Sequence, residues 1–172
     1  MKIKTKRMAR YVTASLLLLG AGLAVFYMSN TGGGTNMNTT PTVMGALMSE
    51  ERSYNFGTIQ MGNGNVSHQF ALKNMGEGPV MIEKIYTSCM CTAAFLVTAS
   101  GERLGPFGMP GHTTPKTNIK LDRGESATLE AVFDPAAHGP SGIGLAQRSV
   151  YIKTTSKDSP EMEFSFEALV IP

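Results

Sequence analysis

The sequence contains no tryptophan, only two cysteines and only three histidines, and charged residues make up 16 % of its 172 positions. It also lacks the motifs of phosphate-binding loops, zinc proteases, α/β-hydrolase nucleophiles and dinucleotide-binding turns. With few histidines and no acidic cluster, we expect no enzymatic activity. The missing tryptophan excludes the Cys–Trp–Cys core of antibody domains.

Charge is absent from a long stretch near the N-terminus, between Arg10 and Glu50. Five basic residues precede this stretch: Lys2, Lys4, Lys6, Arg7 and Arg10. The whole chain has a formal net charge of +2, but the part from Glu50 onward carries 10 basic and 13 acidic residues, a net charge of −3. Such a mildly acidic part offers no broad basic surface to a phosphate backbone, so we expect no nucleic-acid binding.

The uncharged stretch begins with an apolar run of 18 residues, 11–28. As a helix this run would be about 27 Å long, which is just enough to cross the hydrocarbon core of a bilayer. The basic tip at 1–10 predicts a cytoplasmic N-terminus and an extracytoplasmic C-terminal part. We therefore expect a single-pass signal anchor in the cytoplasmic membrane, with a signal peptide cleaved after Ala24 as the alternative. Both interpretations export the rest of the chain.

The remaining sequence divides into a linker and a folded domain. Residues 29–49 are rich in Gly, Asn and Thr and contain no charge, which predicts a flexible linker. From Glu50 onward, apolar and polar residues alternate with a period of two, as in half-buried strands, and no segment keeps a helical period. We expect the folded domain to comprise residues 50–172.

Seven segments of this domain read as strands. They are Tyr54–Ile59, Val66–Lys73, Val80–Tyr86, Thr92–Val97, Ala127–Phe133, Arg148–Thr155 and Met162–Val170. In the second, His68 shares the apolar face with Phe70 and is most simply a core residue. About seven short antiparallel strands predict an all-β fold, an immunoglobulin-like β-sandwich, with a small barrel as the alternative.

Two Gly-rich connections interrupt the strand pattern. The stretch Thr98–Asn118 contains four Gly and three Pro and does not fit a strand, so it is either a binding or capping loop or a mere insertion. Ala136–Leu145 is the second connection. His112 and His138 lie in these two connections, where either surface exposure or metal ligation would explain them.

Cys89 and Cys91 are the only cysteines, and at this spacing on a strand both thiols would point to the same face. Three interpretations stay open: a strained, reducible disulfide or redox pair, a soft-metal site, or two buried core residues. A copper or zinc site would be completed by His112, His138 or Met109. Met90 is a poorer ligand, because on a strand it would face away from both sulfurs.

Six short motifs occur in an order that resembles a known family. They are Asn55–Ile59, Val66–Phe70, Lys73–Gly76, Ile85–Thr92, Arg123–Ser126 and Val132–Pro135. Together they are similar to exported bacterial proteins known as domain of unknown function 1573, which resemble immunoglobulin-like modules of the Hydin type. The resemblance covers about Tyr54 to Val170 and implies an immunoglobulin-like sandwich outside the cytoplasm, with no established activity. Met90, where the family usually has Gly, and the long loop with His112 depart from its pattern.

These observations predict a membrane-tethered, extracytoplasmic immunoglobulin-like module without enzymatic activity. Besides the membrane, its expected partner is an envelope protein or a glycan, bound through loops or an exposed strand edge. The alternative function is soft-metal binding, with copper or zinc, or thiol redox chemistry at Cys89-Met90-Cys91.

Overall fold

The computed structural model describes residues 44–111 and 117–172. The predicted basic tip (1–10), the predicted membrane segment (11–28), the linker as far as residue 43 and His112 all lie outside these ranges. Within the described residues, no helix has the length and apolar character needed to span a membrane.

The described residues form ten strands and two short 3-10 helices. These are β1 (Leu47–Met48), β2 (Ser53–Gln60), η1 (Met61–Asn63), β3 (Val66–Asn74), β4 (Val80–Thr87), β5 (Thr92–Thr98), β6 (Arg103–Phe107), β7 (Ile119–Leu121), β8 (Ser126–Phe133), η2 (Gly139–Gly142), β9 (Gly144–Thr154) and β10 (Glu161–Ile171). The all-β class is confirmed, and the seven predicted strands are present as β2–β5 and β8–β10.

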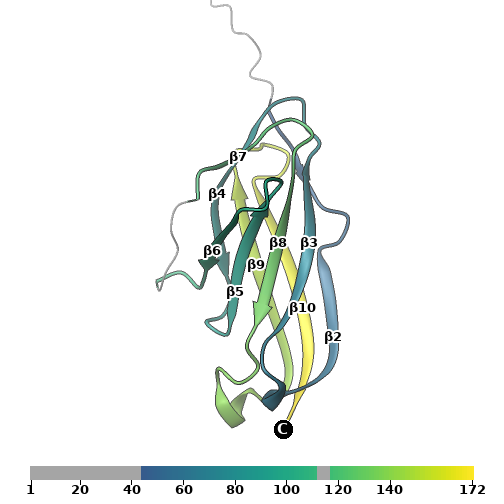
Figure 1. Cartoon of the computed structure of the whole chain (residues 1–172), viewed down its shortest axis with the longest axis vertical. Coiled ribbons are helices and arrows are strands. Elements are labelled where there is room, and N and C mark those ends of the chain that lie inside the picture. The colour runs from purple at the N-terminus through teal and green to yellow at the C-terminus, as the bar shows by residue number, and fades with distance from the viewer. Residues whose placement is uncertain (1–43, 112–116) are drawn as a thin grey trace, which may run out of the picture. The chain divides into compact units, whose positions relative to one another are not determined.

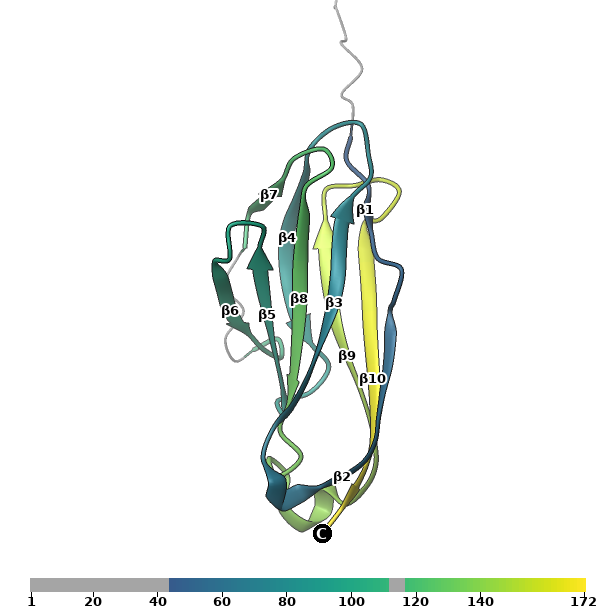
Figure 2. The same cartoon turned by 45° about the vertical axis from the view of Figure 1, so that its right-hand side comes forward.

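The strands form two five-stranded sheets (Figures 1 and 2). Sheet A has the order β1-β3-β8-β5-β6, and sheet B has the order β2-β10-β9-β4-β7. Of these pairs, β2 and β10 run parallel, so the expectation of a purely antiparallel arrangement is wrong there. The chain passes from β1 in sheet A to β2 in sheet B without turning back, which leaves β2 parallel to β10 (Figure 2).

One apolar layer lies between the two sheets. Phe70 of β3 and Phe164 of β10 are fully buried, with ring centroids 5.2 Å apart. Phe133 of β8 meets Phe166 of β10 with centroids 5.5 Å apart. Because each pair joins sheet A to sheet B, and burying one such side chain contributes about 1.5–3 kcal/mol, this layer holds the sheets together as a sandwich.

His68 lies at the margin of this layer, on the inward face of β3 as predicted. Its ring stacks on Tyr54 at a centroid distance of 3.6 Å and meets the edge of Phe70 at 4.7 Å. Nε2 is 3.0 Å from a carboxylate oxygen of Glu51. With its side chain 19 % exposed, His68 is a packed and hydrogen-bonded residue that closes one side of the core.

Strand β6 lies within the stretch 98–118, which was expected not to form a strand, so that expectation is wrong for Arg103–Phe107. Gly105 and Pro106 hide the strand in the sequence because both residues are rare inside sheets. Pro106 is tolerated because β6 is the edge strand of sheet A and pairs only with β5. Phe107 is buried in the core, so this part of the stretch is structural.

Strand β1 precedes Glu50, where the folded domain was expected to begin. Leu47 is fully buried, and β1 pairs with the end of β3. The N–H of Met75 also donates to the carbonyl of Ala46 at 2.8 Å. The folded core therefore reaches back to Leu47, because burial of this one leucine and its ladder with β3 tie the segment to the domain.

Asn74, the last residue of β3, connects three parts of the fold. Its side-chain carbonyl accepts hydrogen bonds from the N–H groups of Ala46 and Gly76 at 3.1 and 3.0 Å. Its amide donates to the carbonyls of Gly78 and Leu121 at 2.9 and 3.0 Å. All four hydrogen-bonding positions of this buried side chain are therefore satisfied, and they hold β1, the β3–β4 turn and β7 together.

Replacing Phe164 by Ala should lower the free energy of unfolding by about 3–5 kcal/mol, because it leaves a cavity against Phe70 in the apolar layer. Urea unfolding followed by far-ultraviolet circular dichroism measures the loss. Gln69→Ala on the outer face of β3 is the matched control and should change stability by no more than about 0.5 kcal/mol. Equal losses in the two variants would contradict the assignment of inner and outer faces.

Candidate functional site

The chain crosses from sheet B to sheet A in the turn that joins β4 to β5, and this turn contains both cysteines. The N–H of Thr92 and the hydroxyl of Thr87 both donate to the carbonyl of Cys89, at 3.2 and 3.0 Å. The N–H of Cys91 donates to Sγ of Cys89 at 3.4 Å. The two cysteines therefore lie in a tight turn between the strands, and this turn brings the two thiols together.

The connection from β8 to β9 brings His138 to the same turn. The N–H of Asp134, directly after β8, donates to the carbonyl of Cys91 at 2.9 Å and anchors the start of the connection there. His138 directly precedes η2, the short helix of residues 139–142. As a result, Nε2 of His138 lies 3.2 Å from Sγ of Cys89.

Arg148 of β9 contacts the second thiol. Its Nε donates to Sγ of Cys91 at 3.0 Å, and its Nη1 donates to the carbonyl of Gln147 at 2.7 Å. Two hydrogen bonds fix the backbone next to Arg148 to the cysteine turn. The N–H of Ser88 donates to the carbonyl of Ser149, and the N–H of Ser149 donates to the hydroxyl of Ser88, each at 2.9 Å. The guanidinium is therefore held in place beside Cys91.

We call Cys89, Cys91, His138 and Arg148 the thiol cluster. The two Sγ atoms and a ring nitrogen of His138 all lie within 4.8 Å of one another. Cys91 is buried, Cys89 is partly buried and His138 is exposed, so the cluster is open to solvent on the histidine side. Both cysteines are free thiols in this structure.

The neighbours of the two thiols give them different acidities. Burial acts to raise the pKa of Cys89, but hydrogen bonds from Cys91, a hydrogen bond with His138 and the charge of Arg148 lower this pKa to about 7. Burial and the hydrogen bond with Cys89 raise the pKa of Cys91, although Arg148 opposes them. At neutral pH, Cys89 is therefore the thiol that ionises.

The cluster unites three of the metal-ligating candidates from the sequence: Cys89, Cys91 and His138. Another candidate, His112, lies outside the described residues. Met90, the poorer ligand candidate, is 62 % exposed.

Arg148 was not among the candidates, although the sequence holds a signal for it. Arg148, Val150 and Ile152 are spaced by two along β9, so they share one face, and Val150 and Ile152 are fully buried. A charged residue in an inward register requires a partner, because an unpaired buried charge is costly. Here that partner is the Cys91 thiol.

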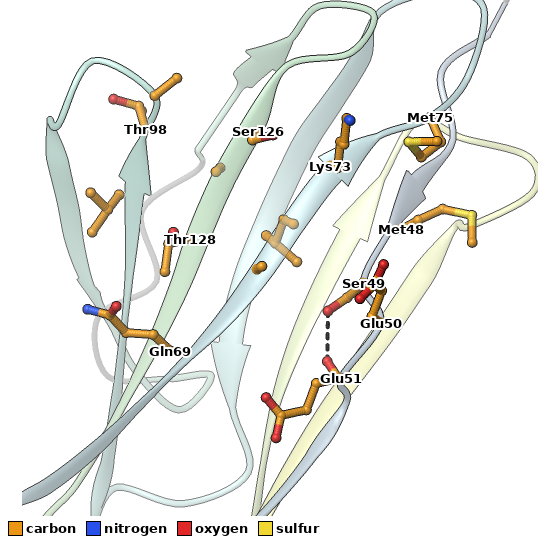
Figure 3. Close-up of a pocket in the computed structure, with 15 residues that line it drawn as sticks. Met48, Ser49, Glu50, Glu51, Gln69, Lys73, Met75, Thr98, Ser126 and Thr128 are labelled. Atoms are coloured by element: carbon orange, nitrogen blue, oxygen red, sulfur yellow. Dashed lines mark hydrogen bonds between the residues drawn. The ribbon is translucent and has the colours of Figure 1, made fainter.

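A second feature is a groove on the outer face of sheet A, next to β3 (Figure 3). Its lining includes Met48–Glu51, Gln69, Lys73, Met75, Ser126 and Thr128. None of the thiol-cluster residues line it. Within the described residues, no strand pairs with positions 66–72 of β3 on the side away from β8, so the groove lies beside unpaired backbone.

Fold and site together define an all-β sandwich domain that carries a Cys–Cys–His–Arg cluster at one inter-sheet crossing. Residues 47–100 match the model of a family described as protein of unknown function (DUF1573), which confirms the resemblance over these residues. The match contains the cysteine turn but ends before His138 and Arg148. A comparison with curated proteins finds no match.

Two solved structures are similar to this chain at low sequence identity. A protein of unknown function from Porphyromonas gingivalis W83 is 16 % identical, with a TM-score of 0.54, and the match covers 78 % of this chain and 51 % of that one. This chain thus spans about half the length of the Porphyromonas protein. The PapD-like domain 7 of human CEP192 is 16 % identical over 73 % of this chain and 84 % of that one, with a TM-score of 0.42.

Alkylation of Cys89 should follow a pH profile with a midpoint at about 7, because only the thiolate reacts and the pKa of Cys89 is lowered to that value. Cys91 should react only at higher pH, since its pKa is raised. Iodoacetamide labelling across a pH series, with peptide mass spectrometry to separate the two sites, measures both profiles.

The matched control for this profile is His138→Gln. This change removes a hydrogen bond that lowers the pKa of Cys89, so the midpoint of its alkylation should move to higher pH. An unchanged midpoint would show that His138 does not act on the thiol.

Proposed function

We propose that the chain is a membrane-tethered, extracytoplasmic immunoglobulin-like module that binds an envelope partner and has no catalytic role. The observation that carries this proposal is the strand order. In sheet A, β1-β3-β8-β5 matches the A-B-E-D order of constant-type immunoglobulin domains, and in sheet B, β10-β9-β4 matches G-F-C. Strands β2, β6 and β7 are additional edge strands.

The N-terminal sequence supports the tether. The basic residues at 1–10 precede an uncharged apolar run at 11–28, a pattern that keeps the N-terminus in the cytoplasm and sends the following chain across the membrane. The net charge of −3 from Glu50 onward argues against nucleic-acid binding. The proposed location is the outer side of the cytoplasmic membrane of a bacterium.

The unpaired side of β3 is the proposed binding surface. No described residue pairs with its backbone N–H and C=O groups between positions 66 and 72, which would take an extended segment of an envelope protein, as in recognition by strand addition. The neighbouring groove provides thioethers from Met48 and Met75, acidic groups from Glu50 and Glu51, and the ammonium of Lys73 (Figure 3). A glycan is the second partner class.

A fusion of alkaline phosphatase after Pro172 should be active in bacterial cells, because this enzyme folds only outside the cytoplasm. Replacing the five basic residues of the tip by Glu should strongly lower the phosphatase activity, since these charges set the orientation. A fluorescent protein that folds only in the cytoplasm, fused at the same position, is the control and should give the opposite signals. Active phosphatase with the acidic tip, at equal expression, would contradict the orientation.

A photo-crosslinking amino acid at Gln69, on the outer face of β3, should capture an envelope protein in intact cells. The matched control is position Lys153, which is exposed on the central strand β9 of sheet B and should capture much less. Equal capture at both positions would contradict a binding surface at β3. Loss of the product after muramidase digestion of the cell wall would instead assign the partner to the glycan class.

A further inference from the structure

We propose that Cys89, Cys91 and His138 bind one Cu(I) ion. The three side chains come from two separate connections, β4–β5 and β8–β9, which lie toward the same end of the sandwich (Figure 1). Their ligand atoms already lie within 4.8 Å of one another. Among the His, Cys, Asp and Glu residues that the structure describes, no other group of three converges in this way.

The distances suit a single ion. Soft-metal bonds of about 2.3 Å to sulfur and about 2.0 Å to nitrogen, in a trigonal arrangement, separate a sulfur from a nitrogen by about 3.7 Å and two sulfurs by about 4.0 Å. Sγ of Cys89 and Nε2 of His138 are 3.2 Å apart. The ion would therefore fit between Sγ of Cys89 and Nε2 of His138 if these two atoms moved apart by about 0.5 Å. His138 is exposed, so its ring has room for this movement.

The ligand set favours copper over zinc. Two thiolates and one imidazole are soft and borderline ligands that suit both metals. Structural zinc sites take four protein ligands, and zinc sites with three, such as Cys2His, add a water molecule, whereas two thiolates and one imidazole by themselves satisfy Cu(I). Among the described His, Cys, Asp and Glu residues, three ligands converge at this site.

The charge of Arg148 also favours a monovalent ion. Two thiolates, one Cu(I) and the guanidinium that donates to Cys91 sum to zero net charge. The same set with Zn(II) would carry a net charge of +1 in a partly buried place, where uncompensated charge is costly. Arg148 thus acts as a positioning residue, because it orients and neutralises Cys91 without contacting the ion.

The decisive measurement is anaerobic competition for Cu(I) between the full-length, reduced chain in mild detergent and the chelator bathocuproine disulfonate. We expect the chain to withdraw one Cu(I) per molecule. X-ray absorption at the copper edge should then show two sulfur neighbours and one nitrogen neighbour. Retention of all copper by the chelator, or one copper per two chains, would overturn the site.

Variants assign the ligands. Cys89→Ser, Cys91→Ser and His138→Gln should each weaken Cu(I) binding by more than the roughly 10–100-fold that outer-shell changes cost, and Arg148→Gln should fall within that range. His138→Gln should also remove the nitrogen neighbour from the absorption spectrum. Because His138 is exposed, the His138→Gln variant tests the site even if a cysteine variant fails to fold. Circular dichroism of the metal-free chains shows which variants fold.

Met90→Leu is the matched control, since Met90 lies between the two cysteines but is largely exposed. It should leave Cu(I) affinity unchanged, and a loss equal to that of Cys89→Ser would overturn the ligand set. Zn(II), measured in competition with a zinc chelator, should bind more weakly than Cu(I), and tighter zinc binding would overturn the choice of metal. A Cys89–Cys91 disulfide that persists under reductant, seen as an absence of free thiols, would overturn the site in favour of the redox interpretation. The proposal is independent of the membrane tether.

Discussion

The apolar layer between the two sheets is the constraint on which the other features depend. Phe70 and Phe164 meet across it, and every long strand must alternate inward and outward residues to contribute to it. Because the layer is continuous, the chain can change sheets only at the ends of strands. The crossing after β4 is one such place, and it is there that the two cysteines lie.

The thiol cluster is a consequence of this architecture. The N–H of Asp134, directly after β8, donates to the carbonyl of Cys91, so the connection that carries His138 starts beside the cysteine turn. Arg148 reaches the cluster because β9 lies next to β4 and its inward register points toward Cys91. Thus the same packing that stabilises the sandwich sets the positions of two thiols, an imidazole and a guanidinium.

The domain presents two different surfaces. The cluster has convergent soft ligand atoms and two thiols of unequal acidity. The groove beside β3 has no such convergence, but it lies next to unpaired backbone, which suits contact with another chain. None of the cluster residues line the groove, so the two features are separate on the domain.

The sequence by itself determined the all-β class and seven strands, because a period of two in apolar residues follows directly from the pleat of a strand. It did not reveal β6, whose Gly105 and Pro106 are permitted only because β6 is an edge strand, or β1, whose single buried Leu47 is too short a signal. It also named Cys89, Cys91 and His138 as candidates without showing that they meet. Only the tertiary structure decided that, since proximity across 49 residues, and the addition of Arg148, depend on how the two sheets pack and cross.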